Sequence, residues 1–219
     1  MKTDEFTARI SEFGVVPVIA IDRVEAALPL ADALIAGGLP VAEITFRTAS
    51  AADVIAALTS KRPSMFVGAG TVLTRDNLYH AIKAGARFCV APGLNAEMVK
   101  RAQDGGVPFV PGVATPTEIE EALALGCKIL KFFPAEAMGG IKMLDAIYAP
   151  YQHTGVRFVP TGGVTQANLE VYLRCKAVAA VGGTWIAKRD DIASAAWGEI
   201  KMRCAAAREI VAKVRGSCV

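Results

Sequence analysis

Ile129-Leu130-Lys131-Phe132-Phe133-Pro134 is an almost wholly apolar stretch whose branched and aromatic residues predict a buried strand. Similar short apolar runs recur along the chain, and amphipathic helical patterns separate them. A repeated strand–helix unit of about 20 to 25 residues fits an α/β fold, a parallel sheet closed into a (β/α)8 TIM barrel. An open doubly wound sheet is the alternative, because periodicity does not report closure.

No Pro-, Gly- or Ser-rich linker divides the chain, so we expect a single (β/α)8 barrel domain over residues 1–219. The expected strands are Val15–Ile21, Val41–Phe46, Met65–Val72, Arg87–Ala91, Phe109–Val113, Lys128–Phe133, Arg157–Thr161 and Ala177–Gly182. The expected helices are Val24–Ala36, Ala51–Lys61, Arg75–Ala84, Asn95–Gln103, Thr117–Leu125, Ile141–Ala149 and Gln166–Arg174. An extra N-terminal helix, Asp4–Phe13, and a long C-terminal helix from about Asp191 complete the domain.

The ends of several expected helices carry recognisable residues. Glycine accepts the left-handed backbone that closes a helix, and it follows helices at Gly37-Gly38, Gly85, Gly105-Gly106 and Gly126. The expected N-caps are Asp76, Thr115 or Thr117, and Thr165.

Composition excludes several classes of protein. Hydrophobic residues make up 53% of the 219 residues and charged residues 21%, which excludes a disordered chain. A net charge of +3 without a basic cluster argues against a nucleic-acid partner. The apolar runs are too short to span a membrane, and the acidic first 13 residues lack a signal core. We therefore expect a cytoplasmic protein.

The cysteines and histidines give no sign of a disulfide framework or a metal site. Five cysteines are spread along the chain without a C-x-x-C motif, and we expect them to be inert packing residues. They are Cys89, Cys127, Cys175, Cys204 and Cys218. The two histidines, His80 and His153, form no H-x-H or H-E-x-x-H pattern, so we expect no metal and no cofactor.

Lys131 is the first candidate for chemistry. Burying an ammonium without a partner is costly, so a buried amine tends to lose its proton. A free amine in a pocket is a nucleophile toward carbonyl groups and can form a Schiff base. The alternatives are a lysine that reaches solvent from the strand end or one that pairs with a hidden carboxylate.

A second polar strand face lies in Val41–Phe46. Alternation puts Glu43, Thr45 and Arg47 on one face. If that face points inward, Glu43, Arg47 and Lys131 look into one cavity. Three charges inside a barrel would be a costly structural choice, which favours a functional site over a buried salt-bridge network.

Two glycine-rich turns follow the last two strands, Pro160-Thr161-Gly162-Gly163-Val164-Thr165 and Val181-Gly182-Gly183-Thr184-Trp185. Glycines let backbone N–H groups approach an anion, and a following helix N-terminus adds partial positive charge. A phosphate site after strands seven and eight recurs in such barrels, so we expect phosphate binding here. We interpret Trp185 as core packing behind the loop.

Taken together, these residues resemble the 2-keto-3-deoxy-6-phosphogluconate (KDPG) and 2-keto-4-hydroxyglutarate (KHG) aldolase family. The resemblance runs from about Gly14 to Lys188 in the family's order and spacing. The matching pieces are Glu43-Ile44-Thr45-Phe46-Arg47-Thr48, Val67-Gly68-Ala69-Gly70-Thr71-Val72, Ala91-Pro92-Gly93, Pro108-Phe109-Val110-Pro111-Gly112, Lys131-Phe132-Phe133-Pro134-Ala135-Glu136, Pro160-Thr161-Gly162-Gly163 and Gly182-Gly183-Thr184-Trp185.

This resemblance implies a cytoplasmic homotrimer that uses metal-free Schiff-base chemistry on a phosphorylated keto acid. Cleavage of 2-dehydro-3-deoxy-6-phosphogluconate would give pyruvate and glyceraldehyde 3-phosphate, and cleavage of 4-hydroxy-2-oxoglutarate would give pyruvate and glyoxylate. The resemblance also implies a role for each site residue: Lys131 forms the Schiff base and Glu43 is the acid/base. Arg47 and Thr71 hold the pyruvate carboxylate, Pro92 and Phe133 shape the pocket, and Thr161 contacts the substrate chain. The phosphate is held by Gly162, Gly163, Gly183 and Thr184.

The departures from the family pattern are small. Thr184 stands where serine is usual, which keeps the hydroxyl, and Phe46 stands where leucine is common on the outward face. The segment after about Lys188 matches loosely. The rival functions are a metal-dependent aldolase, a phosphosugar isomerase or epimerase, a non-catalytic phosphosugar sensor and, within the family, an aldolase for the galactonate epimer.

Overall fold

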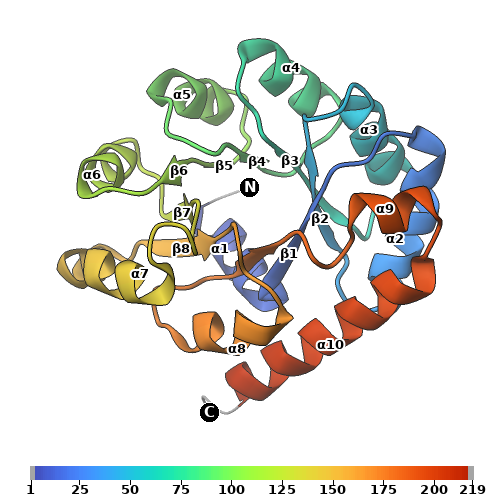
Figure 1. Cartoon of the computed structure of the whole chain (residues 1–219). Helices are drawn as coiled ribbons and strands as arrows, with labels where there is room; N and C mark the ends of the chain where they lie inside the picture. The colour runs from blue at the N-terminus through green and yellow to red at the C-terminus, as the bar shows by residue number, and fades with distance from the viewer. Residues whose placement is uncertain (1–2, 217–219) are drawn as a thin grey trace.

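A computed structural model describes residues 3–216, in which short parallel strands run around a common centre with helices outside them (Figure 1). The strands form a six-stranded sheet of order β5-β4-β3-β2-β1-β9 and a three-stranded sheet of order β6-β7-β8. Their bounds are β1 Val15–Ile19, β2 Val41–Thr45, β3 Phe66–Gly70, β4 Cys89–Val90, β5 Phe109–Val110, β6 Gly112–Val113, β7 Ile129–Phe132, β8 Arg157–Pro160 and β9 Val181–Gly183. The predicted α/β class, with a curled parallel sheet, is confirmed.

The helices alternate with the strands as the sequence predicts. Their bounds are α1 Thr3–Phe13, η1 Val24–Ala26, α2 Ala27–Ala36, α3 Ala51–Lys61, α4 Arg75–Lys83, α5 Ala96–Asp104, α6 Pro116–Ala124, α7 Gly140–Tyr148, η2 Ala149–Thr154, α8 Gln166–Arg174, α9 Arg189–Ala193 and α10 Trp197–Gly216. Most predicted bounds differ from these by one or two residues, and α3 and α8 agree in full.

The edges of the two sheets lie next to each other. The predicted strand Phe109–Val113 is divided into β5 and β6 at Pro111, because proline has no N–H to donate to a ladder. Isolated parallel bridges, Phe158 to Val178 and Thr161 to Gly182, join the other side of the three-stranded sheet to the β9 segment. The last predicted strand, Ala177–Gly182, begins later than expected: regular pairing starts where Val181 meets Val15.

Two expectations at helix ends are wrong. The C-terminal helix predicted from about Asp191 is two helices, because Ala195 adopts a left-handed backbone (φ 56°) between α9 and α10. The N-cap of α4 is Thr74, whose hydroxyl accepts the Asn77 N–H at 3.1 Å; Asp76 lies inside the first turn.

The other predicted helix ends are confirmed. Thr115 caps α6 in a capping box with Glu118, and Thr165 caps α8 with Asn168. Positive-φ glycines follow four of the helices, at Gly38, Gly85, Gly106 and Gly126.

Helix α1 covers the end of the sheet at which the strands begin. Phe6 and Ile10 are buried, and the Phe6 ring lies 5.7 Å from that of Phe88 and 6.3 Å from that of Phe66, the first residue of β3. The ring contacts hold α1 across this end of the strands. In the described part of the chain no helix is long and apolar enough to cross a membrane.

Candidate active site

Lys131 on β7 and Glu43 on β2 meet in the interior although they belong to different sheets. Lys131 Nζ lies 3.5 Å from Glu43 Oε1, and only 7% and 4% of the two side chains are exposed. The Lys131 Nζ also lies 5.4 Å from the centre of the Phe133 ring. The amine therefore has an acidic partner on one side and an aromatic face on another.

These two side chains and Thr161 supply the polar lining of a small interior cavity of about 20 Å³. Its other lining residues are apolar: Phe6, Ile10, Val16, Phe88, Val90, Val110, Ile129 and Val159. Such a volume holds about one water molecule, next to groups that can hydrogen-bond to it. A water at this place could carry a proton to or from Glu43.

Arg47 is not among the residues that line this cavity, and its side chain is exposed, so it is not enclosed with Glu43 and Lys131 as the alternation of β2 predicts. The reason is its place beyond the end of β2, where its side chain is exposed. Its Nε still donates to Thr45 Oγ1 at 3.1 Å, and that hydroxyl donates to the Ile19 carbonyl at 2.9 Å. Arg47 is thereby held at the carboxyl end of β2.

Two glycines make room for the polar side chains of the interior. A Cβ atom on Gly70 would lie 2.2 Å from Glu43 Oε1, and one on Gly182 would lie 2.1 Å from Thr161 Oγ1. Real Cβ atoms essentially never approach other atoms this closely. The glycines of the two sequence motifs therefore set the positions of Glu43 and Thr161.

Thr71 directly follows β3 and has φ of 56°. A positive φ is an outlier for a β-branched residue and costs on the order of 1–3 kcal/mol. Such strain clusters at functional sites, which agrees with the predicted place of Thr71 in the site. Pro92 is half-buried after β4, and its carbonyl lies against Gly112, the residue that pairs with Lys131.

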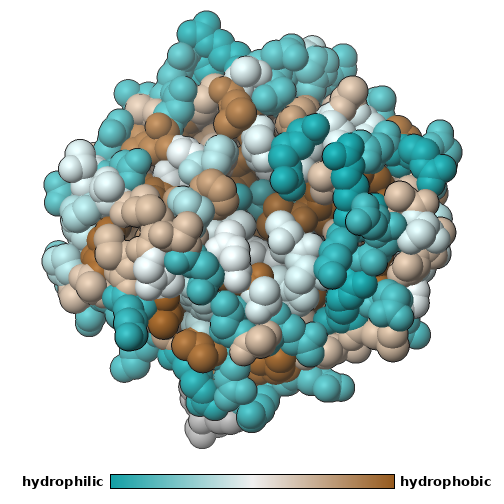
Figure 2. All heavy atoms as spheres, in the orientation of Figure 1, coloured by the Kyte–Doolittle hydropathy of each residue, from teal (hydrophilic) through white to brown (hydrophobic). Residues whose placement is uncertain are grey.

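The two glycine-rich turns lie side by side, since Thr161 and Gly182 form a parallel bridge. Gly162 and Gly163 both have positive φ and precede α8, while Thr184 is exposed. Trp185 packs against the core, and a Cβ on Gly183 would lie 2.5 Å from its ring, so the packing role predicted for Trp185 is confirmed. Figure 2 shows this molecule with a mostly hydrophilic rim around a less polar centre.

Sequence reasoning missed one residue at this end of the sheet. Tyr172 on α8 is almost fully buried, and its hydroxyl donates a short hydrogen bond to the Glu136 carboxylate. Burial, together with that carboxylate, raises the pKa of Tyr172. A tyrosine on an amphipathic helix reads as core in sequence, so no pattern distinguished it.

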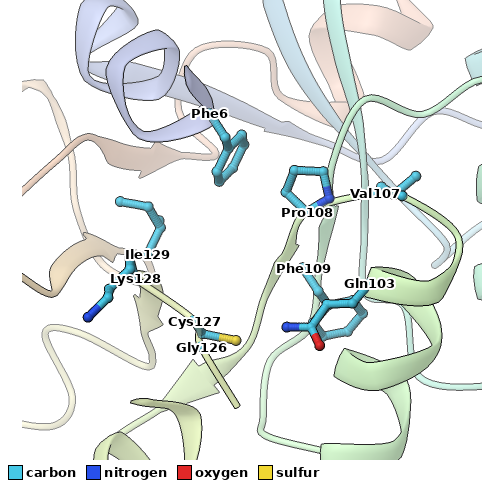
Figure 3. A pocket seen from close by; sticks show the side chains of 10 residues that line it. Phe6, Gln103, Val107, Pro108, Phe109, Gly126, Cys127, Lys128 and Ile129 are labelled. Atoms are coloured by element: carbon cyan, nitrogen blue, oxygen red, sulfur yellow. The ribbon is translucent and has the colours of Figure 1, made fainter. Parts of the chain in front are cut away.

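A second hollow, of about 230 Å³, lies at the other end of the strands beside Phe6 (Figure 3). Its Lys128 Nζ donates to the Thr154 carbonyl at 2.9 Å, and burial raises the pKa of Cys127 to about 11. The thiol therefore stays protonated, and no acid faces the lysine within this lining. The lining offers no nucleophile with an acid/base partner, in contrast to the Lys131 site.

Of the remaining cysteines, Cys89 and Cys204 pack in the core, whereas the thiol of Cys175 donates to Asp145 Oδ1 at 3.0 Å. Cys89 and Cys204 are buried and free, Cys175 is half-buried and free, and Cys218 lies outside the described residues. Within residues 3–216 no group of three or more His, Cys, Asp or Glu side chains is arranged to hold a metal ion.

A curled parallel sheet with outer helices, closed at one end by α1 and carrying an amine–carboxylate pair inside, defines an α/β enzyme with a lysine-centred site. The family profile of the KDPG and KHG aldolases matches residues 6–203. The chain belongs to the KDPG and KHG aldolase family, whose members are lyases that catalyse aldol cleavage.

Individual relatives agree with this assignment. The chain is 45% identical to 2-dehydro-3-deoxy-phosphogluconate aldolase of Haemophilus influenzae over 198 residues, 90% of this chain and 92% of the relative. It is 45% identical to KHG/KDPG aldolase of Escherichia coli over 178 residues, 81% and 83% of the two chains. The crystal structure of KDPG aldolase from Legionella pneumophila, with pyruvate captured as a covalent carbinolamine, is similar with a TM-score of 0.88 and 42% identity, covering 92% of this chain and 97% of that one.

Proposed function

We propose that this chain is a class I, Schiff-base aldolase that cleaves 2-dehydro-3-deoxy-6-phosphogluconate to pyruvate and glyceraldehyde 3-phosphate. A second proposed activity is the cleavage of 4-hydroxy-2-oxoglutarate to pyruvate and glyoxylate. The observation that carries the proposal is the buried contact between Lys131 and Glu43. The names of the relatives and the captured carbinolamine of the Legionella enzyme support it.

The reaction begins when the free amine of Lys131 adds to the C2 keto carbon. The carbinolamine loses water and becomes a protonated imine, which can accept an electron pair. Glu43, through water, takes the proton of the C4 hydroxyl. The C3–C4 bond then breaks and the aldehyde leaves. The electron pair of the broken bond moves toward the imine, which becomes an enamine. Protonation of the enamine at C3 by Glu43 and hydrolysis of the imine release pyruvate and restore Lys131.

The other site residues bind and orient the substrate. Arg47, at the carboxyl end of β2, holds the pyruvate carboxylate through paired charge-assisted hydrogen bonds, and Thr71 assists it. Phe133 and Pro92 shape the pocket around the keto group, and Thr161 contacts the substrate chain. The phosphate is held by the backbone N–H groups of Gly162, Gly163 and Gly183. The hydroxyl of Thr184 donates to it as well. Binding a group that does not react serves to position the one that does.

We also propose that the two sheets are parts of one (β/α)8 barrel that forms a single domain. Two observations support closure: β5 and β6 come from one run interrupted by Pro111, and bridges join β8 to the β9 segment. From the family we further propose a cytoplasmic homotrimer. Light scattering coupled to size exclusion would measure the mass of the assembly, and a monomer would refute the trimer.

Borohydride trapping tests the central proposal. With pyruvate and borohydride, the enzyme should gain one reduced pyruvate on the peptide that holds Lys131. Lys128→Arg is a matched control on the same segment, since Lys128 only donates to the Thr154 carbonyl, and it should leave the adduct intact. No adduct, or an adduct elsewhere, refutes the Schiff base and favours an isomerase or epimerase.

Turnover assays separate the remaining functions. Pyruvate release from both C4 epimers and from 4-hydroxy-2-oxoglutarate identifies the substrate. Absence of turnover with every substrate would indicate a phosphosugar sensor, and activity that disappears with a chelator would indicate a metal-dependent aldolase.

A further inference from the structure

Tyr172 and Glu136 form a contact beside the first glycine-rich turn that the reaction above does not use. Tyr172 lies on α8 with 1% of its surface exposed, and its hydroxyl donates to Glu136 Oε1. Glu136 belongs to the turn that follows β7, five residues after Lys131. The pair therefore ties the segment that carries the lysine to the helix that follows the turn at Gly162 and Gly163.

Glu136 and Ala135 are hydrogen-bonded directly to that turn through their backbone. The Glu136 N–H donates to the Gly162 carbonyl at 3.0 Å, and the Ala135 N–H donates to the Thr161 carbonyl at 2.8 Å. A Cβ on Gly163 would lie 2.6 Å from both Cβ and Cγ of Glu136. The stem of Glu136 thus presses against Gly163, and the place of one determines the place of the other.

The charge of Glu136 makes its orientation important. A carboxylate that swung toward the turn would repel a bound phosphate. Here Oε1 faces the Tyr172 hydroxyl and lies 3.2 Å from where a Cβ on Gly140, the first residue of α7, would be. The raised pKa of Tyr172, which burial and this carboxylate cause, keeps the phenol a donor. The Tyr172 hydroxyl therefore fixes the side chain of Glu136 and keeps its carboxylate pointed away from the turn.

We propose that Tyr172 and Glu136 are positioning residues that hold the turn at Gly162 and Gly163 in its phosphate-binding shape. Through that turn they favour phosphorylated substrates over substrates without a phosphate. This inference rests on the proposed function, because it assigns a role in the grip on the same substrate.

The test uses Tyr172→Phe, which keeps the ring and removes the hydroxyl. It compares the affinity of this variant for a phosphorylated ligand, 2-dehydro-3-deoxy-6-phosphogluconate, with its affinity for pyruvate, which has no phosphate. We expect KM for 2-dehydro-3-deoxy-6-phosphogluconate to rise about three- to tenfold, which corresponds to the net contribution of a typical hydrogen bond, with kcat within about twofold. The pyruvate concentration that gives half-maximal borohydride trapping should stay within about twofold. Tyr151→Phe is the matched control, because Tyr151 donates to Glu120 at 3.0 Å on other helices, and it should change neither quantity.

A second variant guards against a folding defect in the first. Glu136→Ala removes the same bond and the stem, and should give at least the same selective rise in KM. Glu136→Gln keeps an oxygen for the Tyr172 hydroxyl and should restore most of the affinity. Equal changes for both ligands, or no change in Tyr172→Phe and Glu136→Ala, would overturn the positioning role. An unmodified wild-type enzyme after trapping would refute the proposed function itself.

Discussion

Lys131 Nζ lies 3.5 Å from Glu43 Oε1 in the interior of the protein, although 88 residues separate them in the chain. Two interpretations of Lys131 from sequence, an ion pair with a hidden carboxylate and a nucleophile with an acid/base partner, require this same contact. A buried pair is weak evidence for stability, since apolar replacements are often as stable. Substitutions that measure folding and chemistry separately can distinguish the two interpretations.

Lys131→Arg should abolish turnover and borohydride trapping. A guanidinium stays protonated and cannot add to a ketone, yet it can still pair with the Glu43 carboxylate. Circular dichroism should show a folded protein, and the pyruvate assay should show no product. Lys128→Arg, on the same segment, should keep turnover within about twofold. Substantial aldol cleavage by Lys131→Arg would show that the lysine is only structural.

Glu43→Gln should slow turnover by about a hundred- to ten-thousand-fold, the usual contribution of a positioned acid/base. The amide keeps the shape of the side chain next to Gly70 but cannot accept the C4 hydroxyl proton as a base. Imine formation with pyruvate should survive, so trapping and turnover should separate in this variant. An enzyme that cleaves its substrate at the wild-type rate would remove Glu43 from the proton transfers.

Gly70→Ala should lower both stability and kcat, because the new methyl group would lie 2.2 Å from Glu43 Oε1 and 2.6 Å from its Cγ. Overpacking of this kind costs about 1–3 kcal/mol, and the displaced carboxylate would leave its place beside Lys131. Urea titration and the pyruvate assay measure the two effects. Gly198→Ala on α10 is the matched control: nothing lies within 4 Å of its Cβ position, so its stability should stay the same or rise. If Gly70→Ala has the stability and the kcat of the wild type, the methyl group does not displace the Glu43 carboxylate.

The sequence predicts what depends on local pattern. The run around Lys131 gives β7, alternation places Glu43 inside β2, and glycines after helices give four helix ends. The Lys131–Glu43 contact itself joins two sheets, so only the fold brings those patterns together. The isolated bridges between the three-stranded sheet and the β9 segment also join distant parts of the chain, which no periodicity reports.

The errors occur where a single residue overrides its surroundings. Ala195 takes a left-handed backbone that its type rarely adopts, so a helix predicted as continuous is broken there. Arg47 follows the alternation of β2 but lies past the last paired residue, where the strand no longer fixes its side. Tyr172 meets Glu136 through a contact between distant segments, which no local pattern predicts.

An ion pair joins α9 and α10, the two helices on either side of Ala195, and also contacts the end of the second glycine-rich turn. Asp191 on α9 accepts from Arg203 Nη1 on α10 at 2.5 Å, with 18% and 20% of the side chains exposed. The same guanidinium donates to the carbonyls of Trp185 and Ile186 at 3.1 and 3.2 Å. The hydrogen bond from Arg203 lowers the pKa of Asp191 below its usual value.

Asp191→Asn should therefore destabilise the protein in a pH-dependent way. A carboxyl whose pKa is lower when folded stabilises the native state above its unfolded pKa, near 3.9, and this contribution disappears as pH falls through the folded pKa. The loss in unfolding free energy should be about 1.5–2 kcal/mol at pH 7, at the lower end of the range for a hydrogen bond to a charged group, and should shrink below about pH 4. Urea titrations of wild type and variant across pH 3–8 measure it, with the exposed neighbour Asp190→Asn expected within about 0.5 kcal/mol of wild type at every pH. A difference that grows as the solution becomes more acidic would have the wrong sign and would assign the stabilisation to the shape of Asp191 rather than to its charge.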